Sequence, residues 1–371
     1  KFLLIFISVS ILLGINDSHH FRLYVTADVK GETEPCGWKK KPAGGLARKC
    51  TIVNNSKSAG FNTLVLDAGN LFFKQKSIDP GISLDSAIEN TSTIIEAFNH
   101  IGCDAFSPGV LDFAAGVDFL NKLSKKSKFD FISCNIKDSN SNFLFKEYKI
   151  INHQNLNIGI IGATSVFELE GIQVEEPFSS ISNTVSKIRD KCDVIILLFS
   201  ASDSDFKILT TKKDLNADFI VRGNTPRKST SGGSSAVPVY SVGEKGKVLY
   251  QFDLKYDSFD QPLIDIAYHE KIINTNTKRI SRIRQNQSTD QYDKIKTYEN
   301  NIQISRNIIE NTQNSLQYKS IILNKTIQDD PYVLKIVDEG KQRLEEQFGP
   351  LPDPHRGHNH NHNHDHRGHN H

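Results

Sequence analysis

Short apolar segments recur along the chain between residues 21 and 256 and are separated by stretches with helical spacing. Each segment is rich in Val, Ile, Leu and Phe and alternates little with polar positions. Such runs are typical of strands that are buried on both faces in the interior of a sheet. The predicted strands are 21–28, 62–69, 130–136, 157–163, 193–200 and 218–223.

Helices are predicted between these strands, and the alternation indicates an α/β protein. Two further β-rich runs follow, 238–243 and 247–257, split by Glu-Lys-Gly. They predict a hairpin that ends the domain. The predicted helices are 45–58, 83–100, 115–125, 178–190 and 203–214.

The pattern changes after about residue 275. Residues 287–322 are polar and Asn-rich, with apolar positions near helical spacing. They predict a long exposed helix or a helical hairpin. A further amphipathic helix is predicted from Pro331 to Phe348, because two aspartates precede the proline and a Gly-Pro pair follows the helix. We expect 276–349 to form a C-terminal helical extension, whose surface could dock a partner protein.

The two ends of the chain differ from the part between them. Residues 1–15 have a positive start and an apolar run that is short for a bilayer span, which is typical of a secretory signal peptide. We therefore exclude residues 1–18 from the fold and expect residues 19–275 to form one domain. The protein is expected to be exported, periplasmic or extracellular, and to have no membrane attachment after signal cleavage. Residues 350–371 are low in complexity and predict a disordered tail.

The tail contains eight of the 13 histidines. Neutral imidazole suits Zn, Ni and Cu, and alternation with Asn lets neighbouring rings reach one ion from several registers. Binding of transition-metal ions is therefore the preferred interpretation, and a solubilising tail without a metal role is the alternative. The candidate ligands are His355, His358, His360, His362, His364, His366, His369 and His371.

Charge and cysteine content bear on the possible partners of the protein and on its disulfides. The formal net charge is +2, and no dense Lys/Arg stripe with interleaved aromatics is present, which argues against nucleic acid as a partner. The five cysteines contain no CxxC, and an odd number leaves at least one free thiol. A Cys36–Cys50 disulfide is one option, whereas Cys103, Cys134 and Cys192 lie in apolar stretches and are expected in the core.

Several loops that follow the predicted strands resemble the metallophosphoesterase domain of bacterial 5'-nucleotidases. VTADVKGETEPCG at 25–37 is similar to the loop with an Asp-x-His pair, and LDAGN at 66–70 to the L-D-A-G-D loop. SPGVLDF at 107–113 is similar to the segment with Gly-Asn-His-Glu or Gly-Asn-His-Asp. FSAS at 199–202 and RGNTP at 222–226 are similar to the segments that end in Ser-His and Gly-His-Thr-His.

The resemblance implies an αββα sandwich of two sheets, with the helical extension after it. Residues 320–344 are also similar to an extension in a subgroup of the family, some of whose members continue into a multihaem cytochrome module. This chain has no CxxCH, and we expect no haem.

The resemblance also implies where metal ligands would lie, and most of these positions carry other residues. Asp28 matches the first ligand, but Lys30 stands where its histidine partner is expected. Asn70 replaces the bridging aspartate, and Asn224 replaces a histidine of the last motif. Asp112 matches an acid that orients the catalytic histidine. Val110, Leu111, Ala201 and Pro226 stand at further ligand or catalytic positions.

These replacements bear on function because two metal ions clamp the phosphate and generate hydroxide in such sites. We expect no dinuclear metal in the core and a catalytically degenerate binding module, a pseudoenzyme. Asp28, Lys30, Asn70, Asp112 and Asn224 would then fill the old cavity, with Lys30 and Asp28 as an ion pair.

Three alternatives stay open at this point. A small anion such as a nucleotide or phosphate could bind through Lys30 and Arg227. The chain could be a working metal-dependent phosphohydrolase on nucleotides or related esters, with a remodelled site. It could also be a metal-buffering protein whose folded part only carries the tail.

Overall fold

The computed structural model describes residues 19–37, 41–153, 156–212, 214–233, 237–258, 261–285 and 291–349. The predicted signal peptide at 1–18 and the histidine tail, with its eight candidate ligands, lie outside the described residues.

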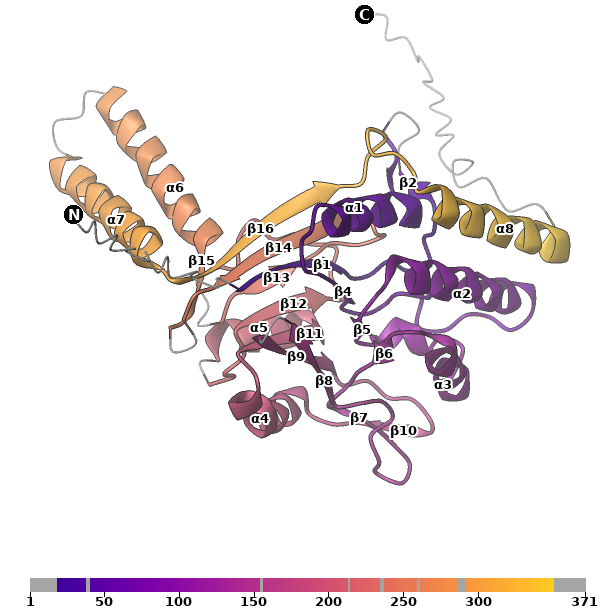
Figure 1. Ribbon diagram of the computed structural model, residues 1–371. Coiled ribbons are helices and arrows are strands. Elements are labelled where there is room, and N and C mark those ends of the chain that lie inside the picture. The colour runs from indigo at the N-terminus through magenta and orange to yellow at the C-terminus, as the bar shows by residue number, and fades with distance from the viewer. Residues whose placement is uncertain are drawn as a thin grey trace, which may run out of the picture.

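Two large sheets face each other in the described part of the chain, and an apolar core lies between them (Figure 1). In spatial order, the larger sheet contains β15 (Leu263–Asp265), β16 (Asn314–Ile322), β14 (Val248–Tyr256), β1 (His19–Thr26), β4 (Thr63–Asp67), β5 (Ala105–Phe106) and β6 (Asp130–Phe131). The smaller sheet contains β13 (Val239–Ser241), β12 (Phe219–Gly223), β11 (Val194–Ser200), β9 (Leu156–Thr164) and β8 (Tyr148–His153). Short pairs are formed by β2 (Pro35–Cys36) with β3 (Ala43–Gly44), and by β7 (Ile136–Asp138) with β10 (Ile172–Val174).

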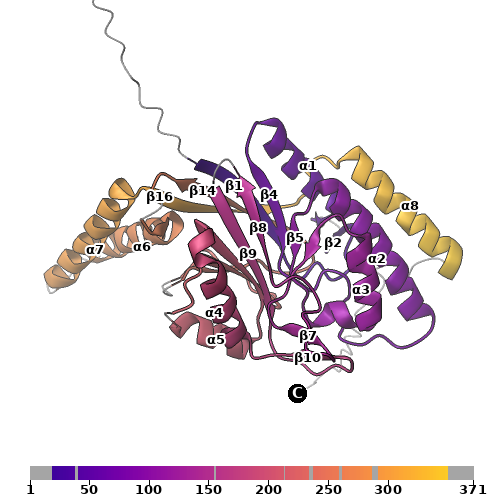
Figure 2. The ribbon, with the colours of Figure 1, turned by 60° about the horizontal axis from the view of Figure 1, so that its bottom comes forward.

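Helices cover the outer faces of both sheets, as Figures 1 and 2 show. The larger sheet is covered by α1 (Leu46–Ser58), α2 (Ile82–Ile101), α3 (Val117–Lys126) and α8 (Pro331–Phe348). The smaller sheet is covered by α4 (Pro177–Ile188) and α5 (Asp203–Thr211). Short 3-10 turns lie at η1 (Val110–Phe113) and η2 (Arg189–Lys191). The layers are therefore helix, sheet, sheet, helix, and the αββα sandwich implied by the resemblance is confirmed.

Alternation along each strand explains why the predicted strands are apolar on both faces. In β11, Ile196 and Leu198 pack in the core between the sheets. Their neighbours Leu197 and Phe199 pack under the helices of the smaller sheet. Successive side chains of a strand point to opposite faces, so a strand between two apolar layers needs apolar residues at every position.

The terminal hairpin predicted for 238–243 and 247–257 is wrong. β13 pairs in parallel with β12 in the smaller sheet, whereas β14 pairs with β1 and β16 in the larger one. The Glu-Lys-Gly segment therefore passes from one sheet to the other. The sequence pattern identified both strands but contained no signal for their partners.

A helical hairpin is present, but the range predicted for it, 287–322, contains only its second helix. The hairpin consists of α6 (Ile266–Gln285) and α7 (Tyr292–Asn311), which project from the sandwich (Figures 1 and 2). His269 lies in α6. The end of the predicted helical range, 314–322, is strand β16, and the proposed extension 276–349 thus contains a strand of the larger sheet.

All five cysteines are unpaired, so the Cys36–Cys50 disulfide is not formed. Cys50 is fully buried on α1, whereas Cys36 is half-buried in β2. The prediction that Cys103, Cys134 and Cys192 are core residues is confirmed. Among the described helices, none combines the length and apolar character that crossing a bilayer requires.

Gly340 sets how closely α8 approaches α2. A Cβ at this position would lie 2.1 Å from Thr93 Oγ1, well inside contact distance. We expect Gly340→Val to lower the free energy of unfolding by about 1–3 kcal/mol through overpacking. Urea denaturation measures this change. Asp338→Val, which places the same side chain on the exposed face of α8, is the control, and equal losses for both variants would contradict the packing argument.

Candidate functional site

The candidate site lies where parallel strands of both sheets end. β1, β4 and β5 are parallel neighbours in one sheet, and β9, β11 and β12 in the other. Asp28 follows β1, Asn70 follows β4 and Asp112 lies in η1 after β5. Asn224 directly follows β12. Ligand sites of α/β proteins commonly lie at the carboxyl ends of strands, where loops converge.

The Asn70 amide connects two of these loops. Its Nδ2 donates to Asp28 Oδ1 at 2.8 Å, and its Oδ1 accepts from the backbone N–H of Leu111 at 3.0 Å. The second Asp28 oxygen accepts from the backbone N–H of Thr225 at 3.0 Å. Asp28 and Asn70 are both fully buried. Both ends of the amide and both oxygens of the carboxylate are thus bonded within the protein.

Asp112 organises the same loops through the backbone. Its carboxylate accepts from the N–H groups of Asn70 at 2.7 Å, Gly109 at 2.8 Å and Phe72 at 2.9 Å. Burial raises the pKa of Asp112 to about 7, although these donors favour the charged form. Asp112 therefore ties the loop after β4 to the turn after β5.

Two glycines allow the loops to approach this closely. Gly69 has φ 103°, and a Cβ there would lie 2.8 Å from the carbonyl oxygen of Ser107. A Cβ on Gly109 would lie 2.4 Å from Asn70 Oδ1 and 2.6 Å from Ser200 Oγ. The glycines of the LDAGN and SPGVLDF segments are thus required by direct contact between loops.

Backbone conformation also marks this edge. Asp28, Lys30, Asn70 and Asn224 have φ between 52° and 59°, in the left-handed region. Non-glycine residues are uncommon there, and such positions gather at ligand-binding and catalytic sites. The backbone conformation at this edge is therefore typical of a ligand-binding or catalytic site.

Lys30 does not make the ion pair with Asp28 that the sequence suggested. Its Nζ lies 2.7 Å from Glu244 Oε2, where both side chains are partly exposed. The pKa of Asp28 is raised by burial, and the Asn70 and Thr225 hydrogen bonds and the charge of Lys30 oppose the rise. Arg227 is exposed at the surface. An anion site built from Lys30 and Arg227 would compete with the Glu244 carboxylate.

No metal-binding side-chain atom is supplied by Ala201, Leu111 or Pro226, which stand at other expected ligand or catalytic positions. Ala201 is fully buried, and its carbonyl oxygen accepts from Arg222 Nε and Nη2, each at 3.2 Å. Leu111 is half-buried in η1, where its backbone N–H is the group bonded to Asn70. Pro226 is exposed.

Arg222 is a buried cation that the sequence analysis missed. It lies in β12 with no exposed surface, donates to Asp203 Oδ1 at 2.7 Å and stacks over the Phe206 ring at 4.2 Å. Its Nη1 has no partner within the described residues. The signal was a charged residue inside an otherwise apolar strand, which requires a partner when buried.

A second buried network supports the LDAGN loop. Lys49 Nζ donates to Thr26 Oγ1 at 2.8 Å, and Thr26 Oγ1 donates to Asp67 Oδ2 at 2.7 Å. The other Asp67 oxygen accepts from the backbone N–H of Gly69 at 3.0 Å. Burial raises the pKa of Asp67 to about 7 and lowers that of Lys49. The motif thus uses Asp67 to fix the loop that carries Asn70.

A cavity of about 650 Å³ opens beside this edge. It lies between the loop after β1, the loop after β4 and helices α2 and α8. Its lining includes Lys30, Phe72, Asn90, Lys341 and Glu345, but not Asp28, Asn70 or Asp112. The space available to a small molecule therefore adjoins the hydrogen-bonded residues without exposing them.

Comparison with known proteins shows which proteins this αββα fold and its sequence are similar to. No family model matches the chain. A trifunctional nucleotide phosphoesterase, YfkN of Bacillus subtilis, is 24% identical over 290 residues, which are 65% of this chain and 20% of that protein. The 5'-nucleotidase of Bos taurus is 25% identical over 277 residues, 66% of this chain and 46% of that protein.

Solved structures show the same architecture. The calcineurin-like phosphoesterase YfkN from Bacillus subtilis has a TM-score of 0.60 and 18% identity, covering 90% of this chain and all of that one. The resemblance to the 5'-nucleotidase and calcineurin-like phosphoesterase superfamily is thus confirmed by fold and by sequence relatives. The chain spans less than half the length of the two curated relatives it matches.

Replacing Asn70 with a second acid would place two carboxyl groups side by side in the interior. We expect Asn70→Asp to lower the free energy of unfolding by about 2 kcal/mol or more at pH 8 and by less at pH 5. The pair would keep a proton that the unfolded chain releases above about pH 4, so the variant loses stability as pH rises.

Chemical denaturation at the two pH values measures this difference. Asn216→Asp is the matched control, because Asn216 also has a positive φ but is exposed. A loss for Asn70→Asp that does not change with pH would contradict the burial of this pair.

Proposed function

We propose that this chain is an exported, catalytically degenerate relative of the 5'-nucleotidases that acts as a binding module, with a tail that binds transition metals. The observation that carries the proposal is the pair of hydrogen bonds made by the Asn70 amide, to Asp28 and to the backbone of Leu111. These bonds occupy the groups that would face a pair of cations.

The donor set supports this proposal. A bridging ligand must offer a negative oxygen to both ions, whereas Asn70 directs an N–H toward Asp28. Asp28 accepts hydrogen bonds with both oxygens, and Asp112 accepts three backbone bonds. None of the described histidines lies in the loops after β1, β4, β5, β11 and β12. These residues fit a dinuclear centre poorly, and we derive no hydrolytic step from them.

The second candidate is a working metal-dependent phosphohydrolase with a remodelled site. The left-handed backbone at Asp28, Asn70 and Asn224 favours it, because such strain is usually kept where side chains must be held for a ligand. Its substrates would be nucleotides or related phosphate esters, the class that the names of the relatives suggest.

Metal content and turnover separate the two candidates. The full chain and a chain ended at Gly349 are loaded with Mn²⁺, Zn²⁺ or Co²⁺ and assayed with AMP and a chromogenic phosphate ester. We expect no turnover and loss of most bound metal with the tail, because imidazole-rich segments hold such ions.

Asp28→Asn is the matched variant for this assay. It removes the one matching ligand while keeping a hydrogen-bonding side chain of the same size. Metal-dependent turnover by the chain ended at Gly349, with about two ions per chain and loss of activity in Asp28→Asn, would establish the hydrolase instead.

Export is the remaining part of the proposal and rests on the apolar run at 1–15. We expect a mature chain that begins near residue 19 and is recovered from the periplasm or the medium. Fractionation with N-terminal sequencing measures this, and a cytosolic chain that still contains residues 1–18 would contradict it.

A further inference from the structure

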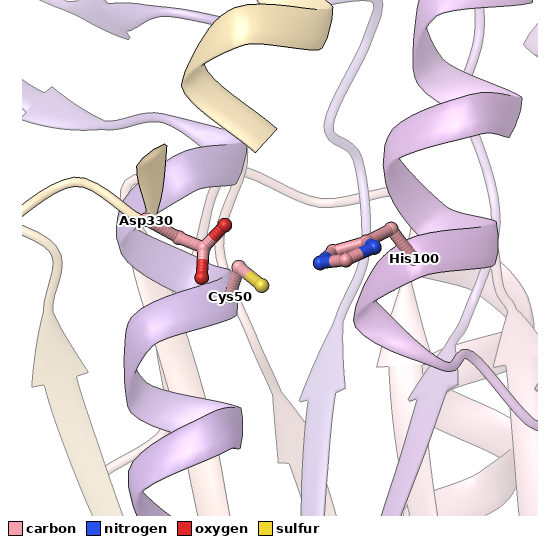
Figure 3. A group of neighbouring side chains, drawn as sticks. All are labelled: Cys50, His100 and Asp330. Atoms are coloured by element: carbon pink, nitrogen blue, oxygen red, sulfur yellow. The ribbon is translucent and has the colours of Figure 1, made fainter. Parts of the chain in front are cut away.

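Three side chains with metal-binding atoms meet on the helical face of the larger sheet, apart from the edge described above. Cys50 comes from α1, His100 from the last turn of α2 and Asp330 from the residue that caps α8. Figure 3 shows the three side chains directed toward one another. The Cys50 sulfur, one imidazole nitrogen of His100 and one carboxylate oxygen of Asp330 all lie within 4.8 Å of one another.

The two carboxylate oxygens of Asp330 make different interactions. Oδ1 accepts from the backbone N–H groups of Tyr332 at 3.1 Å and Val333 at 3.0 Å and thereby caps α8. Oδ2 accepts from Asn54 Nδ2 at 3.2 Å, and the same Nδ2 lies 3.3 Å from Cys50 Sγ. The helix cap fixes the carboxylate, while Oδ2 and the sulfur keep lone pairs that can point to an ion.

His100 is held in place by stacking. Its ring lies on the Tyr332 ring with centroids 4.1 Å apart and an interplanar angle of 19°. Within the described residues, neither ring nitrogen of His100 makes a hydrogen bond. The imidazole is therefore orientated by its face and leaves both nitrogens available. Tyr332 belongs to the turn that Asp330 caps, so one short segment positions two of the three groups.

We propose that Cys50, His100 and Asp330 bind a Zn²⁺ ion, with water as the fourth ligand. Sulfur and imidazole ligands select borderline metals such as Zn²⁺ over Mg²⁺ or Ca²⁺. Tetrahedral Zn–S and Zn–N bonds of about 2.3 and 2.0 Å place the ligand atoms roughly 3.5 Å apart. The ligand atoms, which lie within 4.8 Å of one another, would approach by up to about 1.3 Å through small adjustments of the three side chains, and that of His100 is exposed. That exposure also lets a water molecule reach the ion.

A nucleophilic role for Cys50 is disfavoured by its surroundings. Burial, and next the nearby Asp330 carboxylate, raise the pKa of the Cys50 thiol to about 12. Reactive cysteines have the opposite shift. A bound cation reverses the electrostatics, since Zn²⁺ replaces the thiol proton and the proton leaves to solvent as the Zn–S bond forms.

The ion would join three helices that are distant in sequence. α8 packs on both α1 and α2, and Asp330 lies at the point where it reaches them. Because the three ligands come together only in the folded chain, binding stabilises the fold by mass action. None of these residues belongs to the edge around Asn70 or to the histidine tail.

Cobalt substitution tests the site in the full chain. A Co²⁺–thiolate bond gives charge-transfer absorption in the near ultraviolet, and the tail has no cysteine that could give it. We expect this absorption on adding Co²⁺, its loss on adding Zn²⁺, and its absence in Cys50→Ser. Cys36→Ser is the matched control, because Cys36 is the most exposed of the described cysteines, and it should keep the absorption.

His100→Gln provides a second readout that does not disturb the buried thiol. We expect Zn²⁺ to raise the unfolding temperature of the full chain, and the rise to be smaller in His100→Gln and Cys50→Ser than in Cys36→Ser. Absence of the absorption in the unmodified chain, its retention in Cys50→Ser, or its loss in Cys36→Ser would overturn the site. These results are independent of phosphoesterase turnover, so the proposed function can fail while this site stands.

Discussion

The hydrogen bond from the Asn70 amide to Asp28 is the contact on which the strand edge depends. Asp28 is buried, and a carboxylate in the interior is costly without a donor or a cation. Asn70 supplies a neutral donor, and its oxygen meets the backbone of Leu111. The loops after β1, β4 and β5 therefore close on one another through an amide, in the place where the family resemblance implies metal-bridged carboxylates.

Hydrogen bonds from buried charged side chains hold in place the loops that make this contact. Asp67 is bonded to Thr26 and to the backbone of Gly69, and Lys49 completes the network. On the smaller sheet, Arg222 holds the carbonyl of Ala201 and the carboxylate of Asp203. The framework of the site is thus polar and strongly bonded, and these hydrogen bonds help the loops to keep their left-handed backbone conformations.

α8 has a different relation to the core. Gly340 allows it to lie against Thr93 of α2, and Asp330 starts it beside α1. The same capping carboxylate reaches Cys50 and His100. These contacts pack α8 against α1 and α2. The three metal-binding groups lie where the three helices meet.

The sequence by itself determined the helices of the sandwich and its apolar interior strands, because a strand between two apolar layers must be apolar at every position. It did not predict strands β5, β8 and β16. It also placed Asp28 and Asn70 at strand ends, and the Asp-Asp-Pro start signal located the beginning of α8 at Pro331. Only the tertiary structure decided which side chains and which strands contact one another. Lys30 pairs with Glu244, 214 residues away, β13 and β14 enter different sheets, and Cys50, His100 and Asp330 meet. Local patterns encode burial and backbone conformation, whereas contacts between distant residues depend on how the sheets and helices pack together.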